Sequence, residues 1–185
     1  MQNIRIYQAA NNSTDLKGPL YSHERDENDQ HYPWLQPGYY FWEHHIEDAM
    51  AWGQIRYDGN YSIYSCSYNM DDQTCLDLVS NYRHREFFFH VRERLIKKNK
   101  EDVSIEKIIK WLLDNQKEST RFDCVRLLSK TFYGNRKEIQ VPTPNGQTIK
   151  FCQTTVQVCF YEFPNELITE DFIFVERYSK EPIYG

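Results

Sequence analysis

Residues 37–53, PGYYFWEHHIEDAMAWG, decide how the rest of the chain is interpreted. The four aromatic residues at 39–42 follow a Pro-Gly pair, which predicts a short buried strand because aromatic side chains suit a pleated surface. Apolar residues at helical spacing come next, at Ile46, Ala49 and Met50. Gly53 is the expected C-terminal end of that helix. The stretch therefore predicts a strand that turns directly into a helix, with a flat-walled pocket at the turn.

The composition predicts one globular domain spanning residues 1–185. Of the 185 residues, 40% are hydrophobic and 16% aromatic, which is enough for a sizeable core. The net charge of −5 argues against a general nucleic-acid-binding or anionic-membrane surface. No apolar run is long enough to cross a membrane, and no signal peptide is visible, so a cytoplasmic location is expected.

The first two thirds of the chain alternate between strand and helix patterns. Residues 4–9 alternate as a first strand, whereas the polar segment from Asn11 to Gln36 has no period and is predicted to be a loop over the functional cleft. Residues 61–68 predict another strand. Three helical patterns follow: one capped by Asp71-Asp72 that carries Leu76, Val79 and Tyr82, a stripe over 87–96, and a helix over 105–113 capped by Ser104.

The last third has the pattern of β structure. Strands are predicted at 123–128, 154–161 and 172–177, and Pro144-Asn145-Gly146 predicts a hairpin that joins 138–141 to 148–151. This order of strands, then helices, then strands indicates an α+β fold. We expect a mostly antiparallel, split or sandwiched sheet with a helical insertion in the middle third.

Several common sites are not predicted. Five cysteines without a Cys-x-x-Cys pair are expected to be free buried thiols. The six histidines are scattered, and His44 and His45 are adjacent and point apart on a helix, so no metal site is expected. The chain also lacks a Walker loop and the Gly-x-Gly-x-x-Gly turn of Rossmann folds.

The stretch around Tyr40 resembles a known family. Gly38, Tyr40 and Phe41, followed by a helix that contains Ala49, look like the second motif of ADP-ribosyltransferases. In that family the tyrosine stacks on the nicotinamide of NAD. The resemblance implies an ADP-ribosyltransferase-like fold with NAD as the cofactor.

Other segments resemble the same family in the same order. Residues 4–10 resemble its first strand, with Gln8 where His or Arg is usual, and residues 122–126 and 154–159 look like late strands of bacterial members. Gln157 stands at the position of the late-strand glutamate, which bonds the ribose in the family. Glu162 falls on the opposite face of that strand, with Val158.

The resemblance implies a set of site residues. Gln8, Tyr40 and Gln157 would be the catalytic residues, with their side chains converging on one cleft. The residues expected to contact the cofactor are Tyr7, Ala9, Tyr39, Phe41 and Trp42. The implied activity is transfer of ADP-ribose from NAD to a macromolecule, as in the toxin of a bacterial toxin–antitoxin pair, with an antitoxin or a protein acceptor as partner.

Two alternatives stay open from the sequence. The chain could be a catalytically degenerate module of the same fold that binds a nucleotide or a protein, because amides occupy two of the three catalytic positions. It could also be an unrelated α+β interaction domain in which the aromatic run is simply core. The acceptor, the cognate partner and the oligomeric state do not follow from the sequence.

Overall fold

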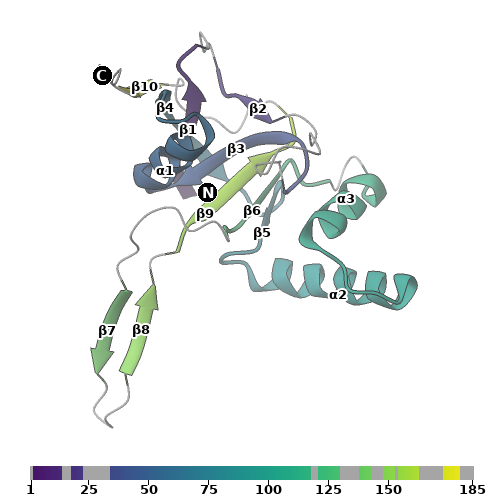
Figure 1. Ribbon diagram of the computed structural model, residues 1–185. Coiled ribbons are helices and arrows are strands. Elements are labelled where there is room, and N and C mark those ends of the chain that lie inside the picture. The colour runs from purple at the N-terminus through teal and green to yellow at the C-terminus, as the bar shows by residue number, and fades with distance from the viewer. Residues whose placement is uncertain are drawn as a thin grey trace.

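The structure is a computed structural model, and it describes residues 2–13, 18–22, 34–117, 121–129, 138–142, 148–152, 154–162 and 173–179. Three helices and ten strands are assigned within these ranges (Figure 1). The first half contains β1 (Gln2–Asn11), β2 (Tyr21–Ser22), β3 (Gly38–Glu43), α1 (Ile46–Arg56), β4 (Tyr61–Met70) and β5 (Cys75–Asp77). The second half contains α2 (Tyr82–Asn99), α3 (Ile105–Asn115), β6 (Cys124–Leu128), β7 (Glu138–Pro142), β8 (Thr148–Cys152), β9 (Val156–Phe160) and β10 (Ile173–Tyr178). The predicted α+β class is confirmed.

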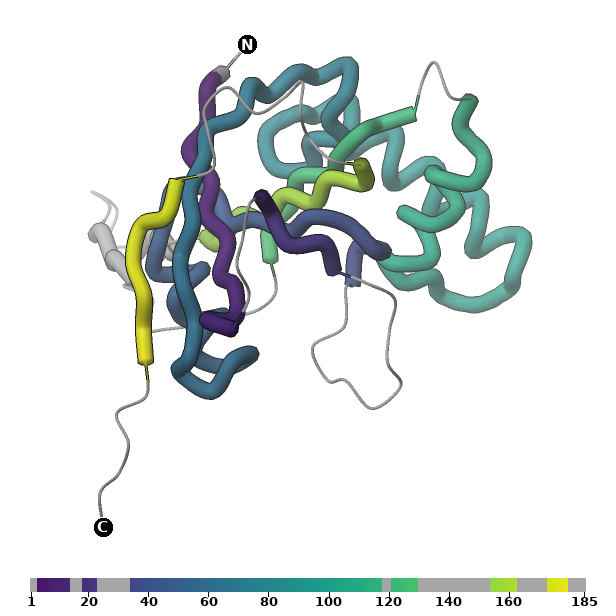
Figure 2. Tube along the Cα trace, turned by 90° about the horizontal axis from the view of Figure 1, so that it is seen from above, coloured from purple at the N-terminus to yellow at the C-terminus, as the bar shows by residue number. Residues whose placement is uncertain are grey.

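Eight of the strands form one open sheet, in the order β10-β4-β1-β3-β9-β6-β5, with β2 also paired to β3. Only β5 and β6 pair in parallel among the described strands, so the predicted mostly antiparallel sheet is confirmed. The predicted hairpin strands β7 and β8 pair antiparallel as a separate two-stranded sheet, and their connecting turn lies outside the described residues. Figure 2 shows β10 and β4 at one end of the molecule and α2 and α3 at the other.

The aromatic strand β3 lies at the centre of the sheet and uses three neighbours. One edge pairs with β9 over Tyr39–Trp42. The other edge is shared, because β2 pairs with Gly38 and Tyr39, whereas β1 pairs with Trp42 and Glu43. A Cβ on Gly38 would lie 2.5 Å from the carbonyl oxygen of Phe160, so only glycine lets β3 approach β9 this closely.

Alternate residues of β3 face two different cores. Tyr40 and Trp42 point to the face covered by the helices, and Phe41 points to the opposite face. On that opposite face, the ring centroids of Tyr68 in β4 and Phe160 in β9 lie only 5.4 Å apart. These strands are three places apart in the sheet, which would separate them by about 14 Å if it were flat. The sheet therefore curls, and we call this side the concave face and the other the helix face.

Helix α1 covers one half of the helix face, and α2 and α3 cover the other half. Ala49 of α1 packs with Trp42 and Ile63. The apolar stripes of α2 and α3 pack with Tyr40, Leu76, Val125 and Cys159. The Ser104 side chain accepts a hydrogen bond from the Lys107 backbone, which confirms the predicted cap of α3. No described helix is long and apolar enough to cross a membrane.

One predicted helix is wrong. Residues Cys75–Asp77 form β5 instead, and Leu76 is buried beside Val125 of β6. The Asp77 carboxylate accepts hydrogen bonds from the backbone of Val79 and Ser80 and so closes a turn. Helix α2 begins only at Tyr82, because the Asn81 side chain caps it.

The predicted end of α1 is also wrong. Gly53 lies inside the helix, which continues to Arg56. A Cβ on Gly53 would lie 2.4 Å from the ring of Tyr61, so this glycine allows close contact between α1 and β4. The signal that looked like a C-cap is therefore a packing requirement.

The predicted loop from Asn11 to Gln36 is described in part. Tyr21–Ser22 form β2 in the main sheet, and Leu35 is fully buried in the core under α2 and α3. These parts are structural and do not form a loop over a cleft. Residues 14–17 and 23–33 lie outside the described ranges, so a covering role there stays a prediction.

Candidate functional site

Gln8, the first predicted catalytic residue, lies where the partner of β3 changes from β2 to β1. Its Nε2 donates to the carbonyl oxygens of Tyr40 at 3.0 Å and Leu20 at 2.9 Å, and its Oε1 accepts from the Leu20 backbone. The side chain is only 4% exposed. Its amide thus replaces the missing strand-to-strand hydrogen bonds at this junction.

The Tyr40 hydroxyl is held by the segment that precedes β3. It accepts a hydrogen bond from the Leu35 backbone at 2.9 Å and donates one to the Gln36 carbonyl at 2.6 Å. Burial, together with the nearby Cys159 thiol, raises the pKa of Tyr40 well above its ordinary value. The ring is 7% exposed, so it is a packed core residue whose hydroxyl stabilises the turn at 35–36.

Gln157 of β9 is bonded to the same preceding segment. Its Oε1 accepts from the indole Nε1 of Trp34 at 2.9 Å. Thr155 is two residues before Gln157 and lies on the same face. Its hydroxyl donates a hydrogen bond to the buried Asp48 carboxylate of α1 at 3.0 Å. Polar side chains therefore line the helix face at this end of β9, between α1 and the Trp34 segment.

The three predicted catalytic side chains do not all share one face. Gln157 pairs with Trp42 in register, so it lies with Tyr40 on the helix face. Gln8 follows Ile6, whose partner is Glu43, and so it lies on the concave face. The expectation that all three enter one cleft therefore fails for Gln8. Its only described contact with Tyr40 is with the backbone, because the two side chains leave neighbouring strands in opposite directions.

The five residues predicted to contact a cofactor are divided in the same way. Tyr7, Ala9 and Trp42 pack with α1 on the helix face, while Tyr39 and Phe41 pack on the concave face. Phe41 and Ala9 are buried, and Tyr39 is partly buried. The buried indole N–H of Trp42 has no hydrogen-bond partner among the described residues.

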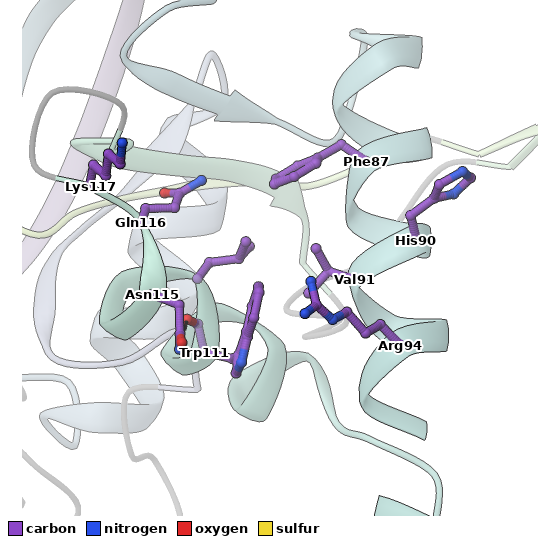
Figure 3. Close-up of a pocket in the computed structure, with 9 residues that line it drawn as sticks. Phe87, His90, Val91, Arg94, Trp111, Asn115, Gln116 and Lys117 are labelled. Atoms are coloured by element: carbon purple, nitrogen blue, oxygen red, sulfur yellow. Dashed lines mark hydrogen bonds between the residues drawn. The ribbon is translucent and has the colours of Figure 1, made fainter. Parts of the chain in front are cut away.

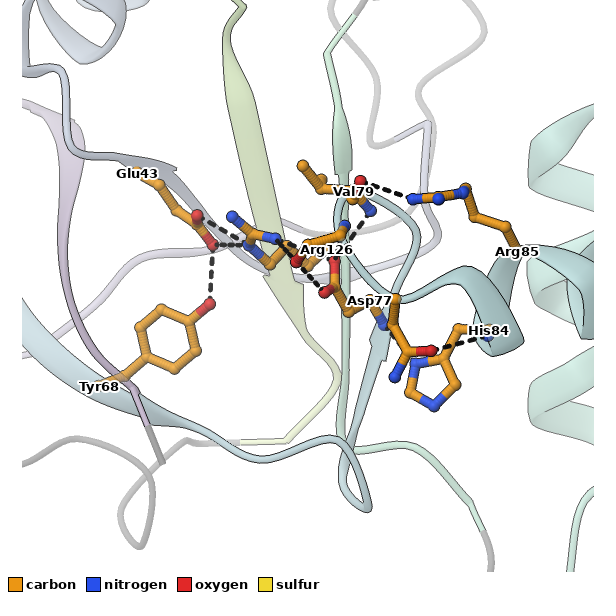
Figure 4. Close-up of polar contacts among 9 residues, drawn as sticks. Glu43, Tyr68, Asp77, Val79, His84, Arg85 and Arg126 are labelled. Carbon is orange, nitrogen blue, oxygen red and sulfur yellow. Dashed lines mark hydrogen bonds and ion pairs between the residues drawn. The ribbon is translucent and has the colours of Figure 1, made fainter.

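The concave face contains a charged cluster that the sequence analysis missed. Arg126 of β6 reaches Glu43 of β3, with its Nε 2.8 Å from each carboxylate oxygen (Figure 4). Its Nη1 lies 2.9 Å from Asp77 of β5, and the Tyr68 hydroxyl donates to Glu43 at 2.7 Å. All four side chains are buried. One arginine thus joins three strands and neutralises two buried carboxylates.

Hydrogen bonds continue from this cluster into α2. The Asp77 backbone N–H donates to Nδ1 of His84 at 3.0 Å, and the Ser80 hydroxyl donates to the Asp77 carboxylate. Burial alone would raise the pKa of Asp77, but the bonds from Ser80, Val79 and Arg126 hold it below its ordinary value. Burial alone would lower the pKa of Arg126, but Glu43 and Asp77 raise it. Asp77 and Arg126 are therefore both ionised at neutral pH.

A groove of about 610 Å³ lies between α2 and α3, and we call it the α2–α3 groove (Figure 3). Its lining residues are Phe87, His90, Val91, Arg94, Trp111, Leu112, Asn115, Gln116 and Lys117. The Arg94 guanidinium lies over the Trp111 ring, 5.9 Å from its centroid. None of its lining residues belongs to β3, although Val91 and Leu112 pack in the same core cluster as Tyr40.

Parts of these sites could have been found from the sequence. Glu43 follows the aromatic run directly, and Asp77 and Arg126 interrupt short apolar segments, a pattern that indicates buried charges in need of partners. Phe87 lies in the predicted helical stripe over 87–96 and Trp111 in the predicted helix over 105–113, and the sequence pattern did not distinguish either from the other residues of its helix. Among the described residues, no group of His, Cys, Asp or Glu is placed to hold a metal ion.

Comparison with known proteins does not assign the chain to a family. No protein-family model matches the chain, and searches of curated proteins and of solved structures gave no match.

Proposed function

We propose that this chain is an ADP-ribosyltransferase-like module that binds NAD or an ADP-ribose-like ligand and transfers ADP-ribose weakly or not at all. The observation that carries the proposal is the contact between Gln157 and Trp34 beside Tyr40. In this contact the Gln157 amide, at the position that resembles the family glutamate, meets the partly buried ring of Trp34 on the helix face of the sheet. Aromatic and hydrogen-bonding groups together are what a dinucleotide site requires.

The arrangement around β3 supports the resemblance. The Gly38–Tyr40–Phe41 pattern begins a strand that leads into a helix with Ala49 fully buried. The partner of β3 also changes beside Tyr40, which leaves an interruption in the sheet bridged by Gln8.

The chemistry of Gln157 accounts for weak transfer. A cationic transition state is stabilised by a carboxylate, whereas a neutral amide provides a hydrogen bond without the full charge. A charge-assisted bond is roughly twice as strong as a neutral one, so the deficit is about 1–2 kcal/mol, or about tenfold in rate. Glu162 is bonded to Arg121 at the surface and Glu43 to Arg126 on the concave face, so neither replaces it.

The burial of Tyr40 also favours binding over turnover. Its ring is packed beneath Leu35 and its hydroxyl is bonded to residues 35 and 36, so stacking on nicotinamide requires that segment to move. Binding of NAD should therefore change the environment of the adjacent Trp34. Its fluorescence provides a direct signal for the proposed site.

Calorimetric titration with NAD, combined with a nicotinamide-release assay, tests the proposal. We expect weak, saturable binding by the parent chain and about tenfold faster nicotinamide release by Gln157→Glu, which can still accept the Trp34 hydrogen bond. Gln54→Glu on the exposed side of α1 is the matched control and should leave release unchanged.

Two results would separate the alternatives. Binding of NAD without any gain in the Gln157→Glu variant would retain a nucleotide-binding module and remove the catalytic assignment. Absence of NAD binding by both proteins would reject the proposal and leave a protein-interaction domain.

A further inference from the structure

The α2–α3 groove has a charge opposite to that of the whole chain. Among its nine lining residues, Arg94 and Lys117 are cations and none is a carboxylate. Helix α2 itself carries six Arg or Lys residues and two Glu, although the chain has a net charge of −5. The lining of the groove is therefore positively charged although the chain is acidic, which favours an anionic occupant.

The inside of the groove is apolar. Phe87 and Trp111 extend from facing helices, and Val91 and Leu112 provide an aliphatic floor continuous with the core (Figure 3). Phe87 is 40% exposed, which is high for a large aromatic residue beside a hollow. Arg94 is already positioned over Trp111, so its charge lies at the rim. An apolar centre with a cationic rim suits a segment that is both hydrophobic and acidic.

Gln116 adds a second feature at one end of the groove. Its side-chain Oε1 is buried and has no hydrogen-bond partner among the described residues. A buried acceptor without a donor destabilises the protein unless another group bonds to it. This end of the groove is therefore polar, whereas its centre is apolar.

We propose that the α2–α3 groove binds an acidic amphipathic segment of a partner protein. Apolar side chains of the segment would lie between Phe87 and Trp111, and a carboxylate of the segment would pair with Arg94 at the rim. A volume of about 610 Å³ accommodates a few large side chains, as expected when an amphipathic helix inserts only its anchors.

The groove is better suited to a peptide than to nucleic acid. Recognition of a phosphate backbone needs a row of cations, whereas only two of the nine lining residues are Arg or Lys. The aliphatic floor of Val91 and Leu112 offers a place for a Leu-like anchor and no hydrogen bond to a base. The overall negative charge of the chain would also oppose a long polyanion more than a short acidic peptide.

Fluorescence anisotropy with a designed probe tests this proposal. The probe is a labelled amphipathic peptide of about 16 residues, with Leu at helical spacing and Asp or Glu elsewhere. A second peptide has Lys in place of every Asp and Glu, and a third probe is single-stranded oligouridine RNA of about 12 nucleotides. We expect saturable binding of the acidic peptide and at least tenfold weaker binding of the other two.

Surface variants locate the site. Arg94→Glu and Trp111→Ala should each weaken acidic-peptide binding about tenfold or more, because both remove groove contacts. Lys110→Glu makes the same charge change on exposed α3 surface, and Phe89→Ala removes an exposed aromatic that does not line the groove. Both controls should bind as the parent does, and circular dichroism should show intact helices in all four variants.

Other outcomes would overturn the proposal. Equal binding of the acidic and basic peptides, or an equal loss in Lys110→Glu and Arg94→Glu, would exclude specific recognition in the groove. Tighter binding of RNA that is lost in Arg94→Glu would make nucleic acid the occupant instead. Arg94 is an exposed residue, so a loss of binding in that variant with an unchanged circular dichroism spectrum is a loss of groove contacts.

Discussion

The side-chain amide of Gln8 donates to the backbone carbonyl of Tyr40 at 3.0 Å, at the position where β3 changes its partner from β2 to β1. The two residues come from different strands, and the bond crosses an interruption in the sheet. Since Gln8 also bonds twice to Leu20, one amide provides three hydrogen bonds to main-chain groups that strands would otherwise satisfy.

Removal of this amide should destabilise the protein. In Gln8→Ala, the partly buried Leu20 N–H and the carbonyl groups of Leu20 and Tyr40 lose their partner, so the free energy of unfolding should fall by about 1–3 kcal/mol. Gln8→Glu should be less stable than Gln8→Ala at neutral pH, because it places a carboxylate in a buried position facing the carbonyl oxygens of Tyr40 and Leu20. Urea unfolding of the three proteins measures the effect, and a Gln8→Glu variant as stable as the parent would contradict it.

Gly53 gives a prediction in which two effects oppose each other. Replacement of a glycine within a helix by alanine stabilises the helix by about 1 kcal/mol. At this position, however, the new Cβ would lie 2.4 Å from the ring of Tyr61. Overpacking of this kind costs about 1–3 kcal/mol, so Gly53→Ala should lower the melting temperature. In the double variant with Tyr61→Ala the clash is absent, and Gly53→Ala should then be neutral or stabilising.

The charged cluster on the concave face predicts that replacement of Arg126 destabilises the protein far more than replacement of Arg121. Arg126→Met leaves Glu43 and Asp77 buried without a cation, and the free energy of unfolding should fall by about 3–5 kcal/mol. Arg121→Met breaks the exposed pair with Glu162 and should cost less than about 1 kcal/mol. Chemical denaturation of both variants provides the comparison. Similar losses in the two would show that the buried pairs are not a major source of stability.

The sequence alone predicted those elements in which apolar residues recur at a regular spacing over several residues. The β3–α1 unit, the Ser104 cap of α3 and most strands of the last third were predicted because alternation or helical spacing is local information. β5 was missed because three residues do not establish a period, and their strand state depends on pairing with β6. Gly53 was wrongly predicted to end α1, because glycine is needed there for the close contact with Tyr61, which is a tertiary interaction.

The candidate site was harder to predict than the fold. Alternation correctly separates Val156 and Val158 of β9 from Gln157. It cannot tell which face of β1 meets which face of β3, since this depends on the register between Ile6 and Glu43. The pairing of Glu43 with Arg126 spans 83 positions in the chain, so no local pattern contains it.

Asp77 gives the cluster a defined dependence on pH. Its pKa is below its ordinary value of 3.8, so the ionised carboxylate contributes stability that is fully present above pH 3.8 and is lost as the pH falls through the folded-state pKa.

Asp77→Asn removes this contribution at every pH. At pH 7 the variant should be less stable than the parent by about 2–3 kcal/mol, because Arg126 loses a charge-assisted partner. The difference should stay constant down to about pH 5 and narrow below pH 3.8, where the parent becomes protonated. Urea unfolding at several pH values measures it, with exposed Asp72→Asn as the control. A difference that remained unchanged below the folded-state pKa would show that Asp77 acts through its shape and neutral hydrogen bonds and not through its charge.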